Sequence, residues 1–150
     1  MYYFTSTFDH VSTSDSSNGE PFRFRLNPES GVPLYRQIID QVLGGIAAGT
    51  LRAGDQLPTV RQVAVDLEIN LNTVLRAYRE LEIRGVLDTQ QGTGTFVAQQ
   101  TVAPESGERD RQLQELVSEF VSRAGANGFT VQELADSLHS WLPDSKKGRS

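Results

Sequence analysis

The chain has 150 residues, 37% of them hydrophobic and 22% charged, and its formal net charge at pH 7 is −5. This length suits one ordinary domain, or a small domain with an appendage, and leaves no room for a catalytic domain of the usual size as well. The absence of cysteine excludes a disulfide framework and thiolate metal sites. The acidic balance excludes a protein that coats nucleic acid non-specifically, whereas specific DNA binding needs only a few arginines on one face.

The start of the chain carries no export or membrane signal. Residues 1–20 contain no Lys or Arg, and no stretch of the chain approaches the roughly 20 apolar residues that a membrane helix requires. We therefore expect a cytoplasmic protein with no membrane contact. Residues 1–20 are also rich in Ser, Thr and Asp, which predicts a disordered leader.

The first ordered elements are expected after residue 20. Apolar residues alternate with arginines over residues 22–26, and this period of two predicts a short half-buried strand. Pro33 suits the first position of a helix, and apolar residues then recur at steps of four from Leu34 to Ile46. Gly49 is expected to end this helix.

Two shorter helices follow with clear start signals. Thr59 and Gln62 form a capping-box pattern, and an apolar stripe behind them predicts a helix of two to three turns. Asn70 can cap the next helix, which Gly85 is expected to end. Two short helices joined by a tight turn are a helix-turn-helix.

A β-hairpin is expected next. Residues 86–90 and 95–97 have strand character and flank the glycine-rich turn Gln91-Gly92-Thr93-Gly94. A hairpin after a helix-turn-helix is a wing. The prediction is therefore an α+β fold, with a short strand and a winged helix-turn-helix domain at residues 21–98.

The remaining sequence predicts a helical tail. Residues 99–108 have the character of a linker, residues 109–143 that of two amphipathic helices separated by a Gly-Asn-Gly turn, and residues 144–150 that of a frayed end. Thr130 and Glu133 form a second capping box. Two short helices cannot bury both of their apolar faces against each other, so a second copy of the chain is expected to cover them. The simpler alternative is a tail that folds back on its own winged helix. The residues expected to mediate dimerisation are Leu113, Leu116, Val117, Phe120, Leu134, Leu138 and Trp141.

The third predicted helix has a polar face suited to DNA. On a helical wheel Asn72, Arg76 and Arg79 lie opposite the apolar side. Asn pairs with adenine, and Arg pairs with guanine or phosphate. Leu71 and Leu75, on an adjoining strip, can contact thymine methyl groups. For an isolated helix an ordinary solvated face would be the better interpretation, and the helix-turn-helix context reverses this preference.

Arg61 lies at the start of the second helix, beside Thr59. A helix N-terminus presents free N–H groups and a positive dipole to a phosphate, and both side chains can add to that site. The alternative is a surface arginine paired with a carboxylate such as Asp66. The local sequence does not separate the two.

Taken together, these motifs resemble the GntR family of bacterial regulators. The resemblance covers residues 33–97 and rests on PLYRQI, the GD..LP..R turn, NTV.RAY.EL and GTGTFV, which are specific only in combination. The short tail is similar to that of the YtrA subfamily, where it serves dimerisation. The resemblance implies that Arg61, Asn72, Thr73 and Arg76 lie at or near DNA and that Gly92 is at the wing tip. The full set of expected DNA-binding residues is Thr59, Arg61, Asn70, Leu71, Asn72, Thr73, Leu75, Arg76, Arg79, Gln91, Gly92 and Thr93.

Two departures from the family pattern bear on affinity. Leu71 stands where relatives commonly have Pro, Arg or Lys, and Gln90-Gln91 stand where the wing often has basic residues. An amide keeps hydrogen bonding but releases no counterion, so non-specific affinity should be lower than for a relative with a basic wing.

Other functions are weaker interpretations. MocR-type regulators join this winged helix to an aminotransferase-like domain that binds pyridoxal phosphate, and the chain is too short for that domain, so we expect neither an enzyme nor a cofactor. His10 and His139 are the only histidines, and they lie in different segments, so no metal site is expected. A winged helix used only for protein interaction remains an alternative. The favoured function is a homodimeric repressor on an inverted-repeat operator near its own operon, with ABC transporter genes a reasonable target. The sequence identifies no small-molecule effector.

Overall fold

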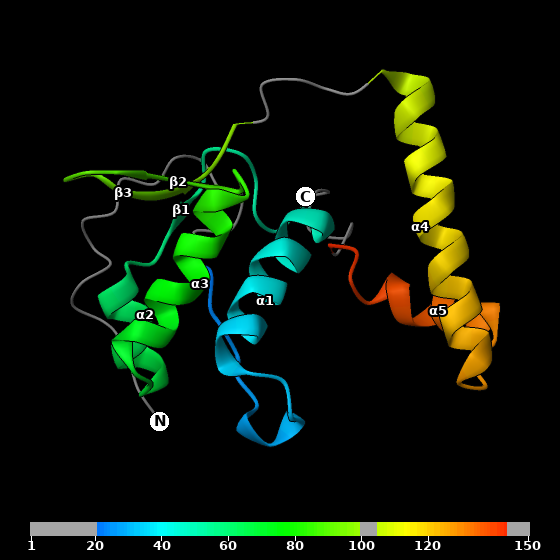
Figure 1. Cartoon of the computed structure of the whole chain (residues 1–150), viewed down its shortest axis with the longest axis horizontal. Coiled ribbons are helices and arrows are strands. Elements are labelled where there is room, and N and C mark those ends of the chain that lie inside the picture. The colour runs from blue at the N-terminus through cyan, green and yellow to red at the C-terminus, as the bar shows by residue number, and fades with distance from the viewer. Residues whose placement is uncertain (1–20, 100–104, 144–150) are drawn as a thin grey trace, which may run out of the picture. The chain divides into compact units, whose positions relative to one another are not determined.

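The computed structural model describes residues 21–99 and 105–143, which belong to two compact units divided after Gln99 (Figure 1). The predicted leader at residues 1–20 and frayed end at residues 144–150 lie outside the described residues. No helix in the described ranges is long and apolar enough to cross a bilayer.

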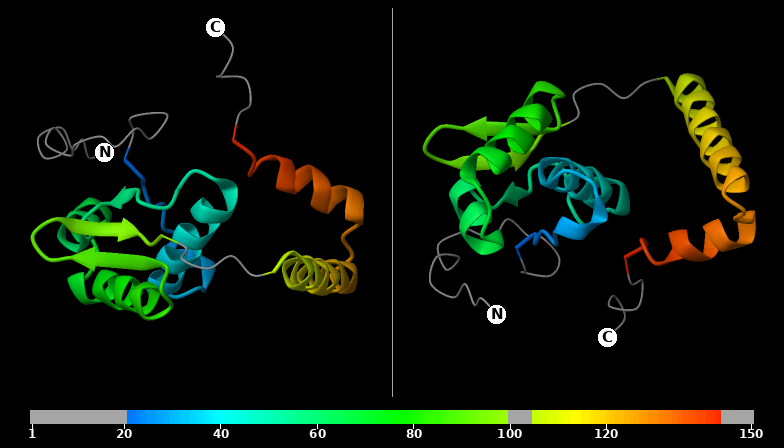
Figure 2. Two further views of the ribbon diagram at one scale, coloured as in Figure 1. Left: turned by 90° about the horizontal axis from the view of Figure 1, so that it is seen from above. Right: turned by 60° about the horizontal axis from the view of Figure 1, so that its bottom comes forward.

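The first unit combines helices with a small antiparallel sheet. The strand order is β1-β3-β2, and the hairpin of β2 and β3 extends beyond the helices in both views of Figure 2. Its elements in chain order are the 3-10 helix η1 (Pro28–Ser30), α1 (Leu34–Ala48), β1 (Gln56–Leu57), α2 (Val60–Leu67), α3 (Leu71–Ile83), β2 (Leu87–Gln90) and β3 (Gly94–Val97).

The core of this unit lies where α1 and α3 pack together. Ile38 and Val42 of α1 and Val74 and Leu81 of α3 are completely buried. Burial of each such side chain contributes about 1.5–3 kcal/mol relative to exposure. Tyr78 of α3 is buried as well, and its hydroxyl donates a 2.6 Å hydrogen bond to the Pro58 carbonyl. Burial raises the pKa of Tyr78, so it stays a neutral donor that fixes α3 against the start of α2.

The predicted starts of both helices of the helix-turn-helix are confirmed, and so is the predicted end of α1. The Thr59 hydroxyl accepts from the Gln62 N–H and the Gln62 side chain accepts from the Thr59 N–H, which completes the capping box of α2. The Asn70 side chain accepts from the Asn72 N–H at the start of α3. Gly49 ends α1 with a φ of 80°, in the left-handed region that glycine adopts without strain.

The strand predicted at residues 22–26 is not a strand. The segment is extended with the expected alternation, because Phe24 is buried and the flanking Arg23 and Arg25 are exposed. Its hydrogen-bond partner is a side chain of α1, however. The Gln41 amide accepts from the Arg25 N–H at 2.8 Å and donates to the Arg25 carbonyl at 2.7 Å. A period of two shows which residues face the core, and it does not show what pairs with the backbone.

β1 was not predicted at all. Its two residues are too short to carry a periodic signal, and it exists because Gln56 and Leu57 pair with Phe96 and Thr95 of β3. The hairpin is as expected apart from its ends. β2 begins one residue later than predicted, at Leu87, and β3 one residue earlier, at Gly94.

The second unit consists of α4 (Ser106–Ala126) and α5 (Val131–His139). α4 begins within the predicted linker, because its first turns hold charged residues that pair along the helix. Arg111 contacts Glu108 at 2.7 Å and Glu115 at 2.9 Å. The capping box of Thr130 and Glu133 is confirmed, and its hydrogen bonds lower the pKa of Glu133.

The end of α5 corrects a further prediction. The two predicted helices extend to residue 143 and include Trp141, but α5 ends at His139. The chain then continues in tight turns, in which the N–H groups of Trp141 and Leu142 donate to the carbonyls of Leu138 and His139. Pro143 follows directly, and the residue before a proline disfavours helical geometry.

Candidate nucleic-acid interface

The polar face of α3 is open to solvent. Asn72, Arg76 and Arg79 are exposed, and Leu75 between them is half-buried. An open hollow runs along this face and is lined by Asn72, Leu75, Arg76, Arg79, Glu80 and Ile83. The opposite face of α3 holds the helix in the core, so the polar residues are presented on a rigid element.

Arg76 contacts an aromatic ring of α1. Its guanidinium carbon lies 3.8 Å from the centroid of the Tyr35 ring, at the start of α1. Within the described residues neither Arg76 nor Arg79 forms an ion pair. Within the described residues both guanidinium groups therefore remain available to a further acceptor.

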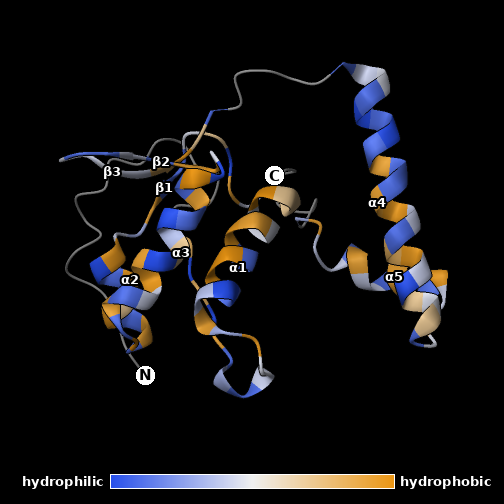
Figure 3. Cartoon of the chain, viewed as in Figure 1, coloured by the Kyte–Doolittle hydropathy of each residue, from blue (hydrophilic) through white to orange (hydrophobic). Residues whose placement is uncertain are grey.

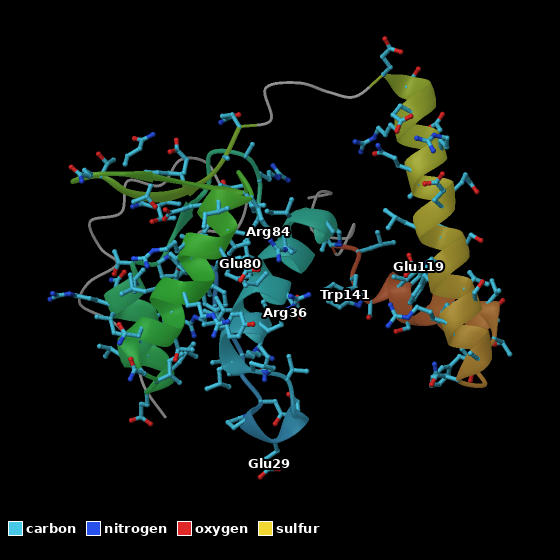
Figure 4. The ribbon with its side chains drawn as sticks, viewed as in Figure 1. Glu29, Arg36, Glu80, Arg84, Glu119 and Trp141 are labelled. Carbon is cyan, nitrogen blue, oxygen red and sulfur yellow. The ribbon has the colours of Figure 1, made fainter. Side chains whose placement is uncertain are left out.

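Charge is divided unevenly along the sequence. Residues 21–99 contain eight arginines and eight Asp or Glu residues, so this range is formally neutral, and the excess negative charge lies in residues 1–20 and 100–150. On α3 the acidic residue nearest the hollow is neutralised, because Glu80 pairs with Arg84 at 2.6 Å (Figure 4). The polar face of α3 is thus locally basic within a range that is formally neutral.

The start of α2 offers backbone donors. The Thr59 hydroxyl accepts from the Gln62 N–H and lies 3.3 Å from the Gln62 carboxamide oxygen, so the capping box occupies it. Arg61 is exposed beside this end. The alternative pairing of Arg61 with Asp66 does not occur, because no ion pair within residues 21–99 joins them. Burial raises the pKa of Asp66, an effect that the nearby Arg23 opposes.

At the start of α3 some polar atoms are likewise used for capping, and others remain accessible. The Asn70 oxygen accepts the capping hydrogen bond, and its NH₂ group has no acceptor within the described residues. Thr73 is half-buried, whereas Leu71 is exposed to 39%. Leu71 can therefore reach a neighbouring molecule, and Thr73 can do so only with the part of its side chain that remains accessible.

The wing tip is exposed but fixed at its base. Gln91, Gly92 and Thr93 are all exposed, and Gly92 has a φ of 77°. The Gln56 side chain of β1 donates to the Thr93 carbonyl at 3.2 Å and packs against Gly94, where a side chain would collide with it. The φ of 135° at Gly94 is a conformation that residues with side chains rarely adopt, and the Gln56 hydrogen bond ties the end of the wing to β1.

The hairpin is also tied to α3. The Thr89 hydroxyl of β2 donates to the Glu82 carboxylate of α3 and lies 3.1 Å from the Thr95 hydroxyl of β3. The helix and the hairpin are thereby connected through a polar network as well as through the core. An acidic residue, Asp88, is exposed on β2, so the wing carries no basic side chain to replace the missing charge at Gln90 and Gln91.

Comparison with known proteins identifies the family. The model described as "Bacterial regulatory proteins, gntR family" matches residues 34–97. The HTH-type transcriptional repressor YtrA of Bacillus subtilis is 30% identical over 120 residues, which is 80% of this chain and 89% of YtrA. The chain belongs to the GntR family.

Solved structures extend this GntR assignment to the fold. YtrA from Sulfolobus acidocaldarius, a GntR-family transcription factor, is 30% identical with a TM-score of 0.50, and the alignment covers 69% of this chain and 97% of that one. A Listeria monocytogenes structure described as a transcriptional antiterminator is 28% identical with a TM-score of 0.61, covering 83% and 93%. The predicted winged-helix fold, the YtrA-like resemblance and the assignment as a transcription regulator rather than an enzyme are confirmed.

Three residues that contribute to this site were not predicted from the sequence. Tyr35 was not singled out, Gln56 lies in a strand too short to predict, and Glu82 follows the apolar positions of α3 with no distinguishing pattern. Each acts through a contact between elements. The PLYRQI motif contains Tyr35 and was a usable signal, but it did not indicate the arginine that the ring would meet.

The second GntR unit exposes its apolar side chains. Leu113, Leu116, Val117 and Phe120 of α4 are 46–65% exposed, and Figure 3 shows apolar bands on both α4 and α5. Leu138 and Trp141 are more than half exposed, and Leu134 is half-buried. No group of three or more His, Asp or Glu residues in the described ranges can hold a metal ion, and His139 is exposed at the end of α5.

Proposed function

We propose that this GntR regulator binds duplex operator DNA through the polar face of α3. The observation that carries the proposal is that Arg76 and Arg79 form no ion pair within the described residues and lie beside Asn72 on a helix whose other face is buried. In a helix-turn-helix such a face enters the major groove, where these side chains can pair with guanine and adenine. Leu71 and Leu75 add apolar contacts to thymine methyl groups.

Phosphate contacts would fix this orientation. At the start of α2 the N–H groups of Val60 and Arg61 have no protein acceptor within the described residues, and the Arg61 side chain is exposed next to them. This is the arrangement that binds a phosphate at a helix N-terminus. Thr59 serves this site through its capping role. The wing tip at Gln91, Gly92 and Thr93 would lie along the neighbouring backbone or minor groove and contribute hydrogen bonds without charge.

The second unit is proposed to form the homodimer. Its exposed apolar residues at Leu116, Phe120 and Trp141 would be costly to leave in water, and contact with the same unit of another copy would cover them. A two-fold assembly matches an inverted-repeat operator with half-sites about 10 base pairs apart. The similarity to YtrA, a repressor by name, supports repression from such a site in the cytoplasm. By the same similarity, the genes proposed to be repressed include ABC transporter genes in the regulator's own operon.

Selection from a random duplex pool tests the proposal. The full-length protein should enrich an inverted repeat, and its affinity for that repeat should fall steeply as salt rises. Replacing one arginine that contacts a phosphate should reduce the slope of log affinity against log salt concentration by about one. A protein that enriches no sequence and binds no duplex at low salt would contradict DNA binding and support the alternative, a winged helix used only for protein contacts.

A further inference from the structure

Arg76 occupies an unusual place among the exposed arginines. Arg36 and Arg84 pair with carboxylates on their own helices. Arg36 lies 3.5 Å from Asp40, and Arg84 lies 2.6 Å from Glu80, a pair that Figure 4 labels. Arg76 instead crosses from α3 to α1, and its guanidinium lies over the ring of Tyr35. No carboxylate in residues 21–99 competes for it. The position of Arg76 is therefore set by an aromatic ring.

Stacking on a ring differs from ion pairing in what it leaves free. An ion pair with a carboxylate uses the N–H groups at the edge of the guanidinium, which are the same groups that pair with guanine or phosphate. A ring contacts the flat face and is attracted to the cation without accepting these hydrogen bonds. Arg76 is thus restrained while its donor edge stays available.

The platform itself is rigid. Tyr35 is half-buried and packs against the core of the first unit, and Ile38 and Ile39 in the next turn of α1 are completely buried. α1 and α3 share the largest helix contact in this unit, so the ring and the arginine are held by the same core. An arginine that is restrained before binding loses less side-chain entropy when it pairs with a base.

We propose that Tyr35 is a positioning residue that holds Arg76 ready to read one base of the operator, with guanine as the preferred partner. The inference rests on the proposed DNA binding through α3. It assigns to α1 a role in sequence specificity, although its tyrosine ring need not touch the base. The hydrogen bonds are made by Arg76, and the ring determines how often they form.

A double-mutant cycle tests the proposal with the full chain. The probes are the inverted repeat enriched from a random duplex pool and a scrambled duplex of equal length. Tyr35→Leu keeps apolar bulk without the ring and should weaken binding to the repeat roughly two- to fivefold, which is the usual strength of an exposed cation–π contact. Binding to the scrambled duplex should not change. Tyr35→Phe keeps the ring and should bind like the original protein.

The cycle separates positioning from other roles of Tyr35. In an Arg76→Ala background Tyr35→Leu should have no further effect, whereas in an Arg79→Ala background the full loss should remain. A loss that persists without Arg76, an equal loss on the scrambled duplex, or a gain in affinity for Tyr35→Leu would each overturn the proposal. Loss of binding in Tyr35→Phe would overturn it too, because the hydroxyl would then be the active group.

A measurement without DNA distinguishes this inference from the proposed function. The Arg76 Nε–H resonance in the NMR spectrum of the free protein should be shifted by the Tyr35 ring current and return towards the ordinary position in Tyr35→Leu. An unshifted resonance in a protein that binds its operator would refute only the positioning role. A shifted resonance in a protein that binds no duplex would refute DNA binding, and the inference would fall with it.

Discussion

The two units of this chain make opposite use of amphipathic helices. In the first unit α1, α2 and α3 each direct buried residues into one cluster that also includes Leu57, Leu87 and Val97 of the sheet. In the second unit Ala124 is the only buried hydrophobic residue among those described, and both helices expose large apolar side chains. The same sequence pattern thus builds a self-contained domain in one case and an unfinished surface in the other. An apolar stripe predicts that a face will be covered, and the number of neighbouring elements decides whether the chain itself can cover it.

Removing the second unit should have the largest effect. Truncation after Ala98 should leave a folded monomer that binds one half-site, because the first unit has its own core. Loss of the second attachment should weaken binding to the full repeat by about 10²–10⁴-fold, the usual gain from linking two sites. Light scattering and titration of half and full repeats provide the measurement. If the full-length protein were monomeric at micromolar concentration, the tail would instead pack against the winged helix of its own chain.

Core substitutions should distinguish the units next. Ile38→Ala opens a cavity at a completely buried site and should reduce the free energy of unfolding by about 2–5 kcal/mol. Ile83→Ala removes a side chain that is 80% exposed and is the matched control within the same unit, with little change expected. Denaturant unfolding of the truncated chain measures both. Equal effects of the two substitutions would show that the described core does not stabilise the domain.

Replacing Arg76 and replacing Arg61 should affect DNA binding in different ways. Arg76→Ala should weaken binding to the operator by roughly 1–3 kcal/mol and relax the preference at one base pair. Arg61→Ala should weaken binding to all duplexes alike and reduce the salt slope by about one. Binding curves for the operator and a scrambled duplex at several salt concentrations separate these outcomes. Unchanged operator affinity in both variants would exclude the proposed DNA surface.

The smallest effect is expected at the wing. Gln91→Arg adds a charge at an exposed tip and should tighten binding to unrelated DNA more than to the operator, since a phosphate contact carries little sequence information. Thr93→Arg adds the same charge two positions further along the exposed tip and is the variant for comparison. If the gain with Gln91→Arg were confined to the operator, this residue would lie over a base edge.

The sequence predicted features that depend on neighbours along the chain. The capping residues Thr59, Asn70 and Thr130 fix helix starts through hydrogen bonds within three residues, so their patterns are visible in the sequence. Features that join distant segments were missed or wrong. The extended segment at residues 22–26 bonds to Gln41, and a side-chain amide gives no periodic signal of this use.

The candidate site also has features that the sequence predicted and features that it did not. The exposure of Asn72, Arg76 and Arg79 follows from the helical wheel, because the opposite face of α3 carries the apolar stripe. The partner of Arg76 does not follow from it. Tyr35 lies 41 positions earlier in the sequence, and only the packing of α1 on α3 brings the two together.

The charge balance of residues 21–99 has a consequence for the rate at which the protein finds DNA. Because the eight arginines of this range are balanced by eight carboxylates and the rest of the chain is acidic, long-range attraction to a duplex should be weak and confined to the locally basic face of α3. Association should then proceed at an unsteered rate of about 10⁵–10⁶ M⁻¹ s⁻¹. Residence time, set by the short-range contacts of α3, would decide which operators stay occupied.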